Sequence, residues 1–431
     1  MKIKKINIGI AGFGNIGSYF YKTLEQNKKS ITIKTGRIPF VKYISAKNIN
    51  KKRKIKIPKS KWIKNYIKLA SMKDVDIVIE LIGGAEGAAK RLVFSALKNK
   101  KHVVTANKAL IAKYGDKLAY LAEKNKVNLE YEASVAGGVP IIRSIKEGLV
   151  ANKINKIYGI LNGTTNYILS SMDRDGLEYS DALLKAQKLG YAESNPTSDI
   201  DGEDVASKLK ILTSLAFNSF INNRSILIEG INNIDKTDIN NANHLGYKIK
   251  LLGVAESRKN KITQRVHPAF VKENTYIAKI NGVLNAVIVE SNPVGKSVLQ
   301  GEGAGSGPTT SSLVSDLCSI LRGNVKFPFV LSDKKRKVAT FENINNKKFS
   351  VYLRLDVKDK YGILSDVTKI MAKNKVSVKR LIQNPTLNKK NASIVIITHE
   401  AKSSSFEKVL LMLKKKRYNL KAPKIIRIEN I

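Results

Sequence analysis

A dense group of carboxylates lies between residues 193 and 204, and a lysine follows it. The group comprises Glu193, Asp199, Asp201, Glu203 and Asp204, with Lys208 four residues further on. Elsewhere carboxylates are scarce, because 35 Asp and Glu stand against 77 Lys and Arg in the chain. In a helix that starts near residue 203, Asp204 and Lys208 share one face. Such a pair could hold an amino-acid substrate and move a proton, but the spacing alone fits a helix cap with a surface ion pair equally well.

A second segment suited to chemistry is the glycine run at residues 12–17, Gly12-Phe13-Gly14-Asn15-Ile16-Gly17. It lies between a strand-like run at 5–11 and a helical pattern at 18–26. In a strand–loop–helix unit, Gly12 allows a tight turn, Gly14 lets a pyrophosphate approach, and Gly17 lets the helix pack closely. We therefore predict a dinucleotide site, with a plain glycine turn as the alternative.

The choice of dinucleotide depends on the end of the second expected strand, at residues 40–45. Ser45-Ala46-Lys47-Asn48 and then Lys51-Lys52-Arg53 follow, without a carboxylate to hold a ribose 2′-hydroxyl. Cations there could accept a 2′-phosphate, so NADP is favoured over NAD. The general excess of lysine is the alternative explanation.

The elements around the glycine run alternate between strand and helix. This alternation predicts an α/β fold with a Rossmann-type, doubly wound parallel sheet over residues 1–131. The further strands are expected at 75–82, 102–105 and 127–131, and the further helices at 88–99 and 110–125.

The regular alternation of strands and helices ends near residue 132. We predict an α+β substrate and dimerisation domain over residues 132–332. Its expected helices are 141–150, 203–218 and 308–322, the last returning to the first domain, and its expected strands are 154–161, 262–267 and 284–290. Residues 333–349, rich in Lys and Asn, are predicted to be a linker. Residues 350–431 show a βαββαβ order, which is ferredoxin-like. The expected strands there are 350–357, 376–383, 392–398 and 424–429, with helices at 362–374 and 403–415.

Composition limits the other function classes. The formal charge of +42 suits a nucleic-acid binder, but the sequence has no recognisable nucleic-acid-binding motif. A general enrichment of lysine at solvent-exposed positions is therefore the better interpretation. We expect no nucleic-acid partner. No apolar run is long enough for a membrane span, and the first residues lack a signal-peptide pattern. The one cysteine, Cys318, cannot form an intrachain disulfide. We therefore expect a cytoplasmic protein without a membrane partner.

The carboxylate-rich segment, residues 186–208, resembles the signature of the homoserine dehydrogenase family at Ala186, Gly190-Tyr191-Ala192, Asn195-Pro196, Asp199-Ile200, Gly202, Asp204 and Lys208. Residues 161–168, 105–108 and 132–140 resemble further motifs of the family. The resemblance implies NAD(P)-dependent, reversible hydride transfer between L-homoserine and L-aspartate 4-semialdehyde, in threonine, methionine and isoleucine biosynthesis. The alternative is another NAD(P)-dependent hydroxy-acid dehydrogenase with an ACT-type sensor. Because no aspartate kinase domain precedes residue 1, we expect a monofunctional enzyme.

The resemblance also implies residue roles. Lys208 and Lys108 would be catalytic, and Glu193, Asp199 and Asp204 would bind the substrate. The cofactor would contact the glycine run together with Thr105, Lys108, Gly303 and Gly305. Two lysines in one pocket disfavour each other's protonation, as burial also does, so we expect one of them to become neutral near the working pH.

Two further sites follow from resemblance. Glu132, Val135, Gly137 and Val139 match the family's monovalent-cation site, which suits sodium, although a plain turn is the alternative. Residues 350–431 resemble an ACT domain, through their element order and residues 359–367. The implied ligand is a small amino acid, expected to be the inhibitor threonine, held by the loop before the first helix at a domain–domain interface. The alternative is a dimerisation module that binds nothing. A homodimer or homotetramer is expected.

Overall fold

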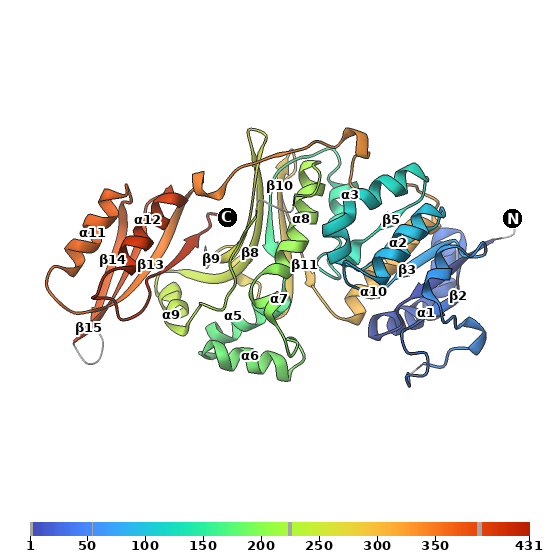
Figure 1. Ribbon diagram of the computed structural model, residues 1–431, viewed down its shortest axis with the longest axis horizontal. Coiled ribbons are helices and arrows are strands. Elements are labelled where there is room, and N and C mark those ends of the chain that lie inside the picture. Colours follow the sequence, from blue (N-terminus) through green and yellow to red (C-terminus); the bar gives the residue numbers. More distant parts are fainter. Residues whose placement is uncertain (1–2, 54, 223–225, 386–389) are drawn as a thin grey trace.

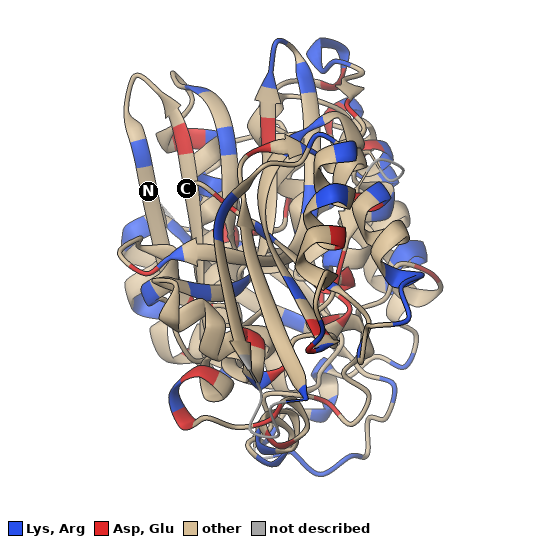
Figure 2. Ribbon diagram, turned by 90° about the vertical axis from the view of Figure 1, so that its left-hand side faces the viewer, with Lys and Arg blue, Asp and Glu red and all other residues tan. Residues whose placement is uncertain are grey.

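The computed structural model describes residues 3–53, 55–222, 226–385 and 390–431. Figure 1 shows an elongated molecule in three parts, with α1 at one end and α11 at the other. Lys and Arg are spread over all of these parts rather than gathered on one face (Figure 2). Among the described residues, no helix combines the length and apolar character that crossing a membrane requires.

The first part is a parallel sheet of five strands in the order β2-β1-β3-β4-β5. Helices α1 and α10 cover one face, and α2 and α3 cover the other. The predicted doubly wound fold is confirmed, although α1 is much longer than expected. Because β2 and β3 flank β1, the chain order reverses there and opens a crevice at the carboxyl ends of the strands. The elements are β1 (Lys4–Ala11), α1 (Asn15–Thr35), β2 (Arg37–Ser45), β3 (Ile77–Glu80), α2 (Ala88–Lys98), β4 (His102–Thr105), α3 (Lys108–Lys124) and β5 (Leu129–Glu130).

The middle part is built on a mostly antiparallel sheet in the order β11-β10-β6-β8-β9. Helices α5, α8 and α9 pack against this sheet, and α8 also contacts α3 of the first part. Its elements are β6 (Lys153–Ile160), α5 (Gly163–Asp175), α6 (Tyr179–Lys188), α7 (Thr197–Ile200), α8 (Glu203–Phe217), α9 (Lys236–His244), β8 (Tyr247–Arg258), β9 (Lys261–Lys272), β10 (Leu284–Asn292), β11 (Gly295–Glu302) and α10 (Ser306–Leu321). The helix α10 was expected to begin at 308, and it packs against α1, so the chain returns to the first part.

The last part has the predicted βαββαβ order, with both helices on one face of the sheet. The elements are β13 (Lys348–Lys358), α11 (Ile363–Lys373), β14 (Val378–Pro385), β15 (Asn391–Thr398), α12 (Ser403–Lys414) and β17 (Lys424–Ile428). The final strand β17 also pairs in parallel with β9, at Arg427 with Ala269 and Ile428 with Phe270. The sheets of the middle and last parts are therefore one continuous sheet.

Residues 333–349 connect these two parts, but they are not the free linker that their polar composition suggests. The Arg336 side chain is fully buried and donates to Asp116 at 2.6 Å and to the Ser219 carbonyl at 2.8 Å. A short strand, β12 (Thr340–Phe341), pairs with the start of β9. A buried guanidinium needs acceptors, and these come from residues distant in sequence, so the contact cannot be seen in the local composition.

Candidate active site

The carboxylate of Asp204 lies between two ammonium groups from different parts of the molecule. Gly202, with a φ of 87°, turns the chain into α8, so Asp204 lies in the first turn of the helix and Lys208 lies one turn later. Asp204 accepts from Lys208 Nζ and from Lys108 Nζ, each at 2.7 Å. Asp204 is 4% exposed. The expected pair at four-residue spacing therefore exists, and it is buried rather than a surface ion pair.

Asn162 holds this carboxylate group together, although sequence reasoning did not single it out. Its side chain donates to Asp199 Oδ1 and to Asp204 Oδ2, both at 2.8 Å. Its own oxygen accepts from the main-chain N–H of Thr165 and so caps helix α5. The preceding carbonyl, of Leu161, accepts from Lys208 at 2.6 Å. The sequence signal that could have identified Asn162 is its position at a helix start inside the 161–168 motif, where asparagine is a favoured cap.

The contact between Asp204 and Lys108 shifts the pKa of both groups. Burial alone would raise the pKa of Asp204, but the ammonium groups of Lys208 and Lys108 outweigh it and hold that pKa well below its usual range. Burial likewise acts to lower the pKa of Lys108, yet the charge of Asp204 outweighs it and raises that pKa. Lys108 is therefore not the lysine that drifts toward neutrality, because the Asp204 carboxylate lies beside its ammonium group.

The remaining predicted substrate ligands, Asp199 and Glu193, lie near this pair. The side chain of Lys108 is 42% exposed, and the carboxylates of Asp199 and Glu193 contribute to its raised pKa. Asp199 is partly buried, and burial and then the Asp204 charge raise its pKa. Glu193 lies exposed on the loop before α7. The structure thus places Lys108 and Lys208 on Asp204 and joins Asp199 to Asp204 through Asn162. Glu193 lies close enough for its charge to act on Lys108.

The glycine run has the close contacts that a dinucleotide loop requires. A Cβ at Gly12 would lie 2.3 Å from the Leu81 carbonyl oxygen, and one at Gly17 would lie 2.3 Å from the Gly12 oxygen. No atom of the other described residues lies within 4 Å of the Cβ position of Gly14, so the backbone there is open to a ligand. The roles predicted for these glycines agree with this geometry.

Two helix N-termini converge beside this loop. Helix α1 begins after Gly14 and α10 after Gly305, and neither N-terminus has a side-chain cap. A cavity of about 340 Å³ is lined by residues 14–17 together with Gly305 and Ser306. Free main-chain N–H groups and aligned helix dipoles favour an anion such as a pyrophosphate. Gly303 is instead packed against Asn285, whose side chain would lie 2.1 Å from an added Cβ.

The adjoining cavity, of about 550 Å³, extends from the glycine run to the end of β2. Lys47, Lys51 and Arg53 line it, and none of the described residues lining it is a carboxylate. Arg53 uses its donors on main-chain carbonyls, including those of Phe13 at 3.2 Å and Asn48 at 2.6 Å. Among the described residues that line the cavity, this leaves Lys47, Lys51 and Lys64 as the cations free to meet a phosphate.

Family models match the chain along most of its length. The model described as homoserine dehydrogenase matches residues 140–318, its NAD-binding domain matches 12–132, and an ACT domain matches 351–415. The homoserine dehydrogenase of Neisseria gonorrhoeae is 40% identical over 409 residues, covering 92% of each chain. That of Helicobacter pylori is 38% identical and covers 99% of this chain and 100% of its own.

The chain belongs to the homoserine dehydrogenase family. It is an oxidoreductase with a nicotinamide-dinucleotide domain and a C-terminal ACT domain. The solved homoserine dehydrogenase of Thiobacillus denitrificans superposes with a TM-score of 0.92 at 35% identity, covering 99% of this chain and 98% of its own. A hyperthermophilic archaeal homoserine dehydrogenase in complex with NADPH superposes with a TM-score of 0.60 at 25% identity, over 73% of this chain and 97% of its own.

One predicted cofactor residue of this homoserine dehydrogenase fold has its side chain turned into the protein. Thr105 is fully buried, and its hydroxyl donates to Glu80 Oε2 at 2.5 Å. Glu80 in turn accepts from the main-chain N–H groups of Ile82 and Gly83. Thr105 also accepts from the N–H of Asn107, which caps α3 just before Lys108. The Thr105 side chain therefore orients the loop that carries Lys108 rather than facing the cofactor cavity.

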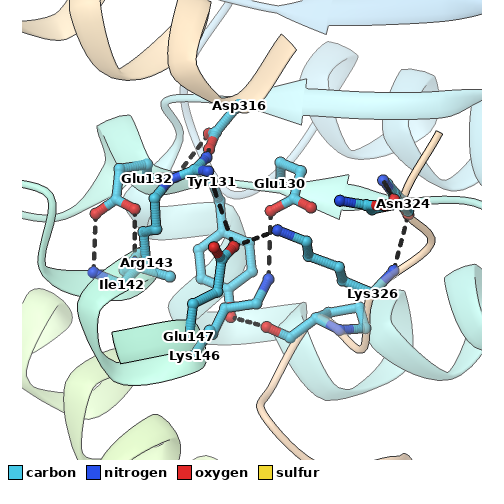
Figure 3. A network of polar contacts seen from close by, with 12 residues as sticks. Glu130, Tyr131, Glu132, Ile142, Arg143, Lys146, Glu147, Asp316, Asn324 and Lys326 are labelled. Carbon is cyan, nitrogen blue, oxygen red and sulfur yellow. Dashed lines mark hydrogen bonds and ion pairs between the residues drawn. The ribbon is translucent and has the colours of Figure 1, made fainter. Parts of the chain in front are cut away.

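Of the predicted cation ligands, Glu132 lies where the first and middle parts meet (Figure 3). Glu132 is 2% exposed, and its two oxygens accept from the main-chain N–H groups of Ile142 and Arg143 at 2.8 and 2.7 Å. The carbonyls of Gly137 and Val139 accept from Ser312 and Ile141 respectively. Each of these oxygens retains a second lone pair, so the set suits a hard monovalent ion. Burial raises the pKa of Glu132 to about 7 against the opposing N–H groups.

Proposed function

We propose that this chain catalyses reversible hydride transfer between L-homoserine and L-aspartate 4-semialdehyde, with Lys208 as the proton donor and acceptor. The observation that carries the proposal is the Asp204 carboxylate, which joins Lys208 of α8 to Lys108 of α3 beside the dinucleotide crevice. Because the two lysines come from different domains, the site exists only when the domains are docked.

In aldehyde reduction, the nicotinamide supplies the hydride. The ammonium of Lys208 donates hydrogen bonds to Asp204 and to the Leu161 carbonyl. From this position it can give a proton to the developing alkoxide. Lys108, kept protonated by Asp204, stabilises the same oxygen electrostatically. In homoserine oxidation, Lys208 takes the hydroxyl proton instead. The carboxylates of Glu193 and Asp199 bind the substrate ammonium at the open side.

The test is homoserine oxidation by the purified chain, followed by the absorbance of the reduced nicotinamide. We expect turnover with homoserine and none with 2-hydroxy acids that lack the amino group, because Glu193 and Asp199 would then have no cation to bind. Equal turnover of both substrate types would contradict the assignment.

We propose NADP as the preferred cofactor. Lys47 and Lys51 line the cavity near the end of β2, and none of its described lining residues is a carboxylate. NADPH is bound by the archaeal relative. Lys51→Glu should lower kcat/KM for NADP by about tenfold, the effect of losing one charge-assisted contact, and leave NAD little changed. Lys52→Glu is the matched control, because Lys52 is exposed and does not line the cavity.

We also propose that Glu132, Val135, Gly137 and Val139 hold a sodium ion. Three buried carboxylates, Glu130, Glu132 and Asp316, lie close together there, and a bound cation would offset their repulsion. The ion would stabilise the docking of the domains and take no chemical step. Thermal unfolding in sodium chloride against choline chloride tests this, with the higher midpoint expected in sodium.

Threonine is proposed as an inhibitor acting through the ACT domain, with the domain match as support. Among the described residues, the loop before α11 is exposed to solvent, and so is the side chain of Tyr361.

A homodimer or homotetramer is proposed because β11, an eight-residue edge strand, presents an unpaired outer side among the described residues. Light scattering tests the assembly. The free thiol of Cys318 suits a reducing cytoplasm.

A further inference from the structure

Arg336 lies between the two helices that carry Lys108 and Lys208, and its side chain is fully buried. Its Nη2 donates to Asp116 of α3 at 2.6 Å and to the Ser214 hydroxyl of α8 at 2.9 Å. The same nitrogen donates to the main-chain carbonyl of Ser219, just past the end of α8, at 2.8 Å. Because α3 belongs to the first domain and α8 to the middle domain, one guanidinium joins the two domains.

The contacts of Arg336 lie on the same two helices as the ion pair between Lys108 and Asp204. Asp116 follows Lys108 by eight residues on α3, and Ser214 follows Asp204 by ten residues on α8. At about 1.5 Å per residue, the two contact points are about 12 Å apart on α3 and about 15 Å apart on α8. Since these separations nearly match, sliding or turning one helix against the other disturbs both contacts.

Aromatic rings and the surrounding backbone fix the direction of the guanidinium. Its central carbon lies 4.7 Å from the ring centre of Phe220 and 4.3 Å from that of Phe329. The main-chain N–H of Asp333 donates to the carboxylate of Glu123, in the last turn of α3, at 2.9 Å. The segment that carries Arg336 is therefore itself attached to α3, and the guanidinium extends from there to α8.

The energy of this contact argues for a role in alignment. Two nitrogens of Arg336, Nε and Nη1, are buried without a hydrogen-bond partner among the described residues. A buried guanidinium with unsatisfied donors adds less to stability than a fully satisfied pair, because the cost of removing the charge from water is repaid only in part. Its fixed position between Asp116 and Ser214, by contrast, specifies one arrangement of the two helices.

The Lys108–Asp204 pair is sensitive to that arrangement. The two atoms are 2.7 Å apart across the domain boundary, and their attraction weakens as the distance grows. Burial acts to lower the pKa of Lys108, and the carboxylates of Asp204, Asp199 and Glu193 outweigh it. Lys208 contacts the same carboxylate of Asp204 from within α8. A small shift of α3 therefore separates Lys108 from Asp204 while Lys208 keeps its contact.

We propose that Arg336 is a positioning residue for hydride and proton transfer, because it joins α3 to α8 and so keeps the ammonium of Lys108 on Asp204. This inference rests on the proposed function, where Lys108 and Lys208 have their roles. Arg336 acts through the two helices, since its contacts lie more than two helical turns from Lys108 along α3.

The main test is Arg336→Ala, with circular dichroism to verify folding. In aldehyde reduction kcat should fall about tenfold or more, within the loss that a misplacement of about 1 Å can cause. The alkaline fall in kcat should move to lower pH, because Lys108 loses the charge that raises its pKa. NADPH affinity should change by less than about twofold. Arg336→Lys should restore activity only in part, because lysine is shorter and lacks the planar group that stacks on the rings.

Two further variants separate alignment from general stability. Ser214→Ala removes one acceptor on α8 with little change of volume, and it should move the alkaline fall in the same direction by a smaller amount. Arg354→Ala is the matched control, because the Arg354 side chain is 4% exposed and pairs with Asp235 and Asp238, away from α3 and α8. It should lower the unfolding midpoint and leave kcat and the pH profile within about twofold and unmoved, respectively.

A titration of Lys108 tests the inference without any turnover. Competitive acetylation at a series of pH values, measured by mass spectrometry on the peptide that carries Lys108, should give a lower midpoint in Arg336→Ala and in Ser214→Ala. Unchanged midpoints in both folded variants would overturn the proposal, and so would an equal shift in Arg354→Ala. Shifted midpoints in a chain that does not turn over homoserine would support the alignment by Arg336 and contradict the proposed function instead.

Discussion

Asp204 and Glu132 are both almost fully buried, at 4% and 2% exposed, yet their pKa values are shifted in opposite directions. Burial acts to raise the pKa of both carboxyl groups. Asp204 contacts two ammonium groups directly, and these more than offset burial. Glu132 receives two main-chain N–H bonds, while Arg143 and Lys146 act on it only through longer-range attraction.

The difference shows what each site can do. At Asp204 full charges meet, so the carboxylate stays ionised, raises the pKa of Lys108 and holds the ammonium of Lys208 in place. At Glu132 the negative charge is undercompensated, and the neighbouring carboxylates Asp316 and Glu130 increase this imbalance (Figure 3). A monovalent cation would supply the missing charge. Our proposals therefore give burial a catalytic role at Asp204 and a role in domain docking at Glu132.

The largest effect is expected from Lys208→Ala, which removes the ammonium that Asp204 positions. We expect kcat to fall by about 10³-fold or more in both directions, the upper part of what acid–base catalysis contributes. NADPH affinity, measured by fluorescence titration, should change by less than about twofold. Lys210→Ala, on the same helix, is the control, and a near-normal rate in Lys208→Ala would remove the role assigned to this lysine.

A smaller effect is expected from Asp204→Asn, which keeps the shape and removes the charge. Asp204 raises the pKa of Lys108, so its removal lowers that pKa. In aldehyde reduction the protonated form is needed, and the alkaline fall in kcat should therefore move to lower pH, with about a 10²-fold loss of rate. The pH profile is the measurement, with Glu203→Gln as an exposed control on α8. An unmoved alkaline limb would show that Asp204 does not set the charge of the site.

The smallest effect is expected from Glu132→Gln. A carboxamide has a single oxygen, so one of the N–H groups of Ile142 and Arg143 loses its acceptor at a cost of about 1–3 kcal/mol. The unfolding midpoint should drop by a few degrees, and its dependence on sodium against choline should disappear, while kcat stays close to normal. Glu147→Gln, in the same network but 44% exposed on its side chain, should leave both properties intact. A sodium effect that persists in Glu132→Gln would exclude this carboxylate as the ion's ligand.

Sequence patterns predicted the elements best where local signals were strong. The parallel sheet and the βαββαβ tail follow from short apolar strands that alternate with helical periods. The middle part was predicted less completely, because α5, α6, α9, β8 and β11 were not expected. The strand β8 is buried over most of its length and so lacks clear alternation, and α9 is polar, with Asp235 and Asp238 forming a capping box.

The sequence by itself determined the chemistry that depends on neighbours along the chain. Asp204 and Lys208 share one helix face because they are four residues apart, and the glycines at 12, 14 and 17 act within one strand–loop–helix unit. Only the tertiary structure decided which charges meet. It brought Lys108 to Asp204, placed Asn162 between two carboxylates, and joined β17 to β9. The signs of the pKa shifts belong to this second class, because burial and the distance to the nearest opposite charge exist only after the chain has folded.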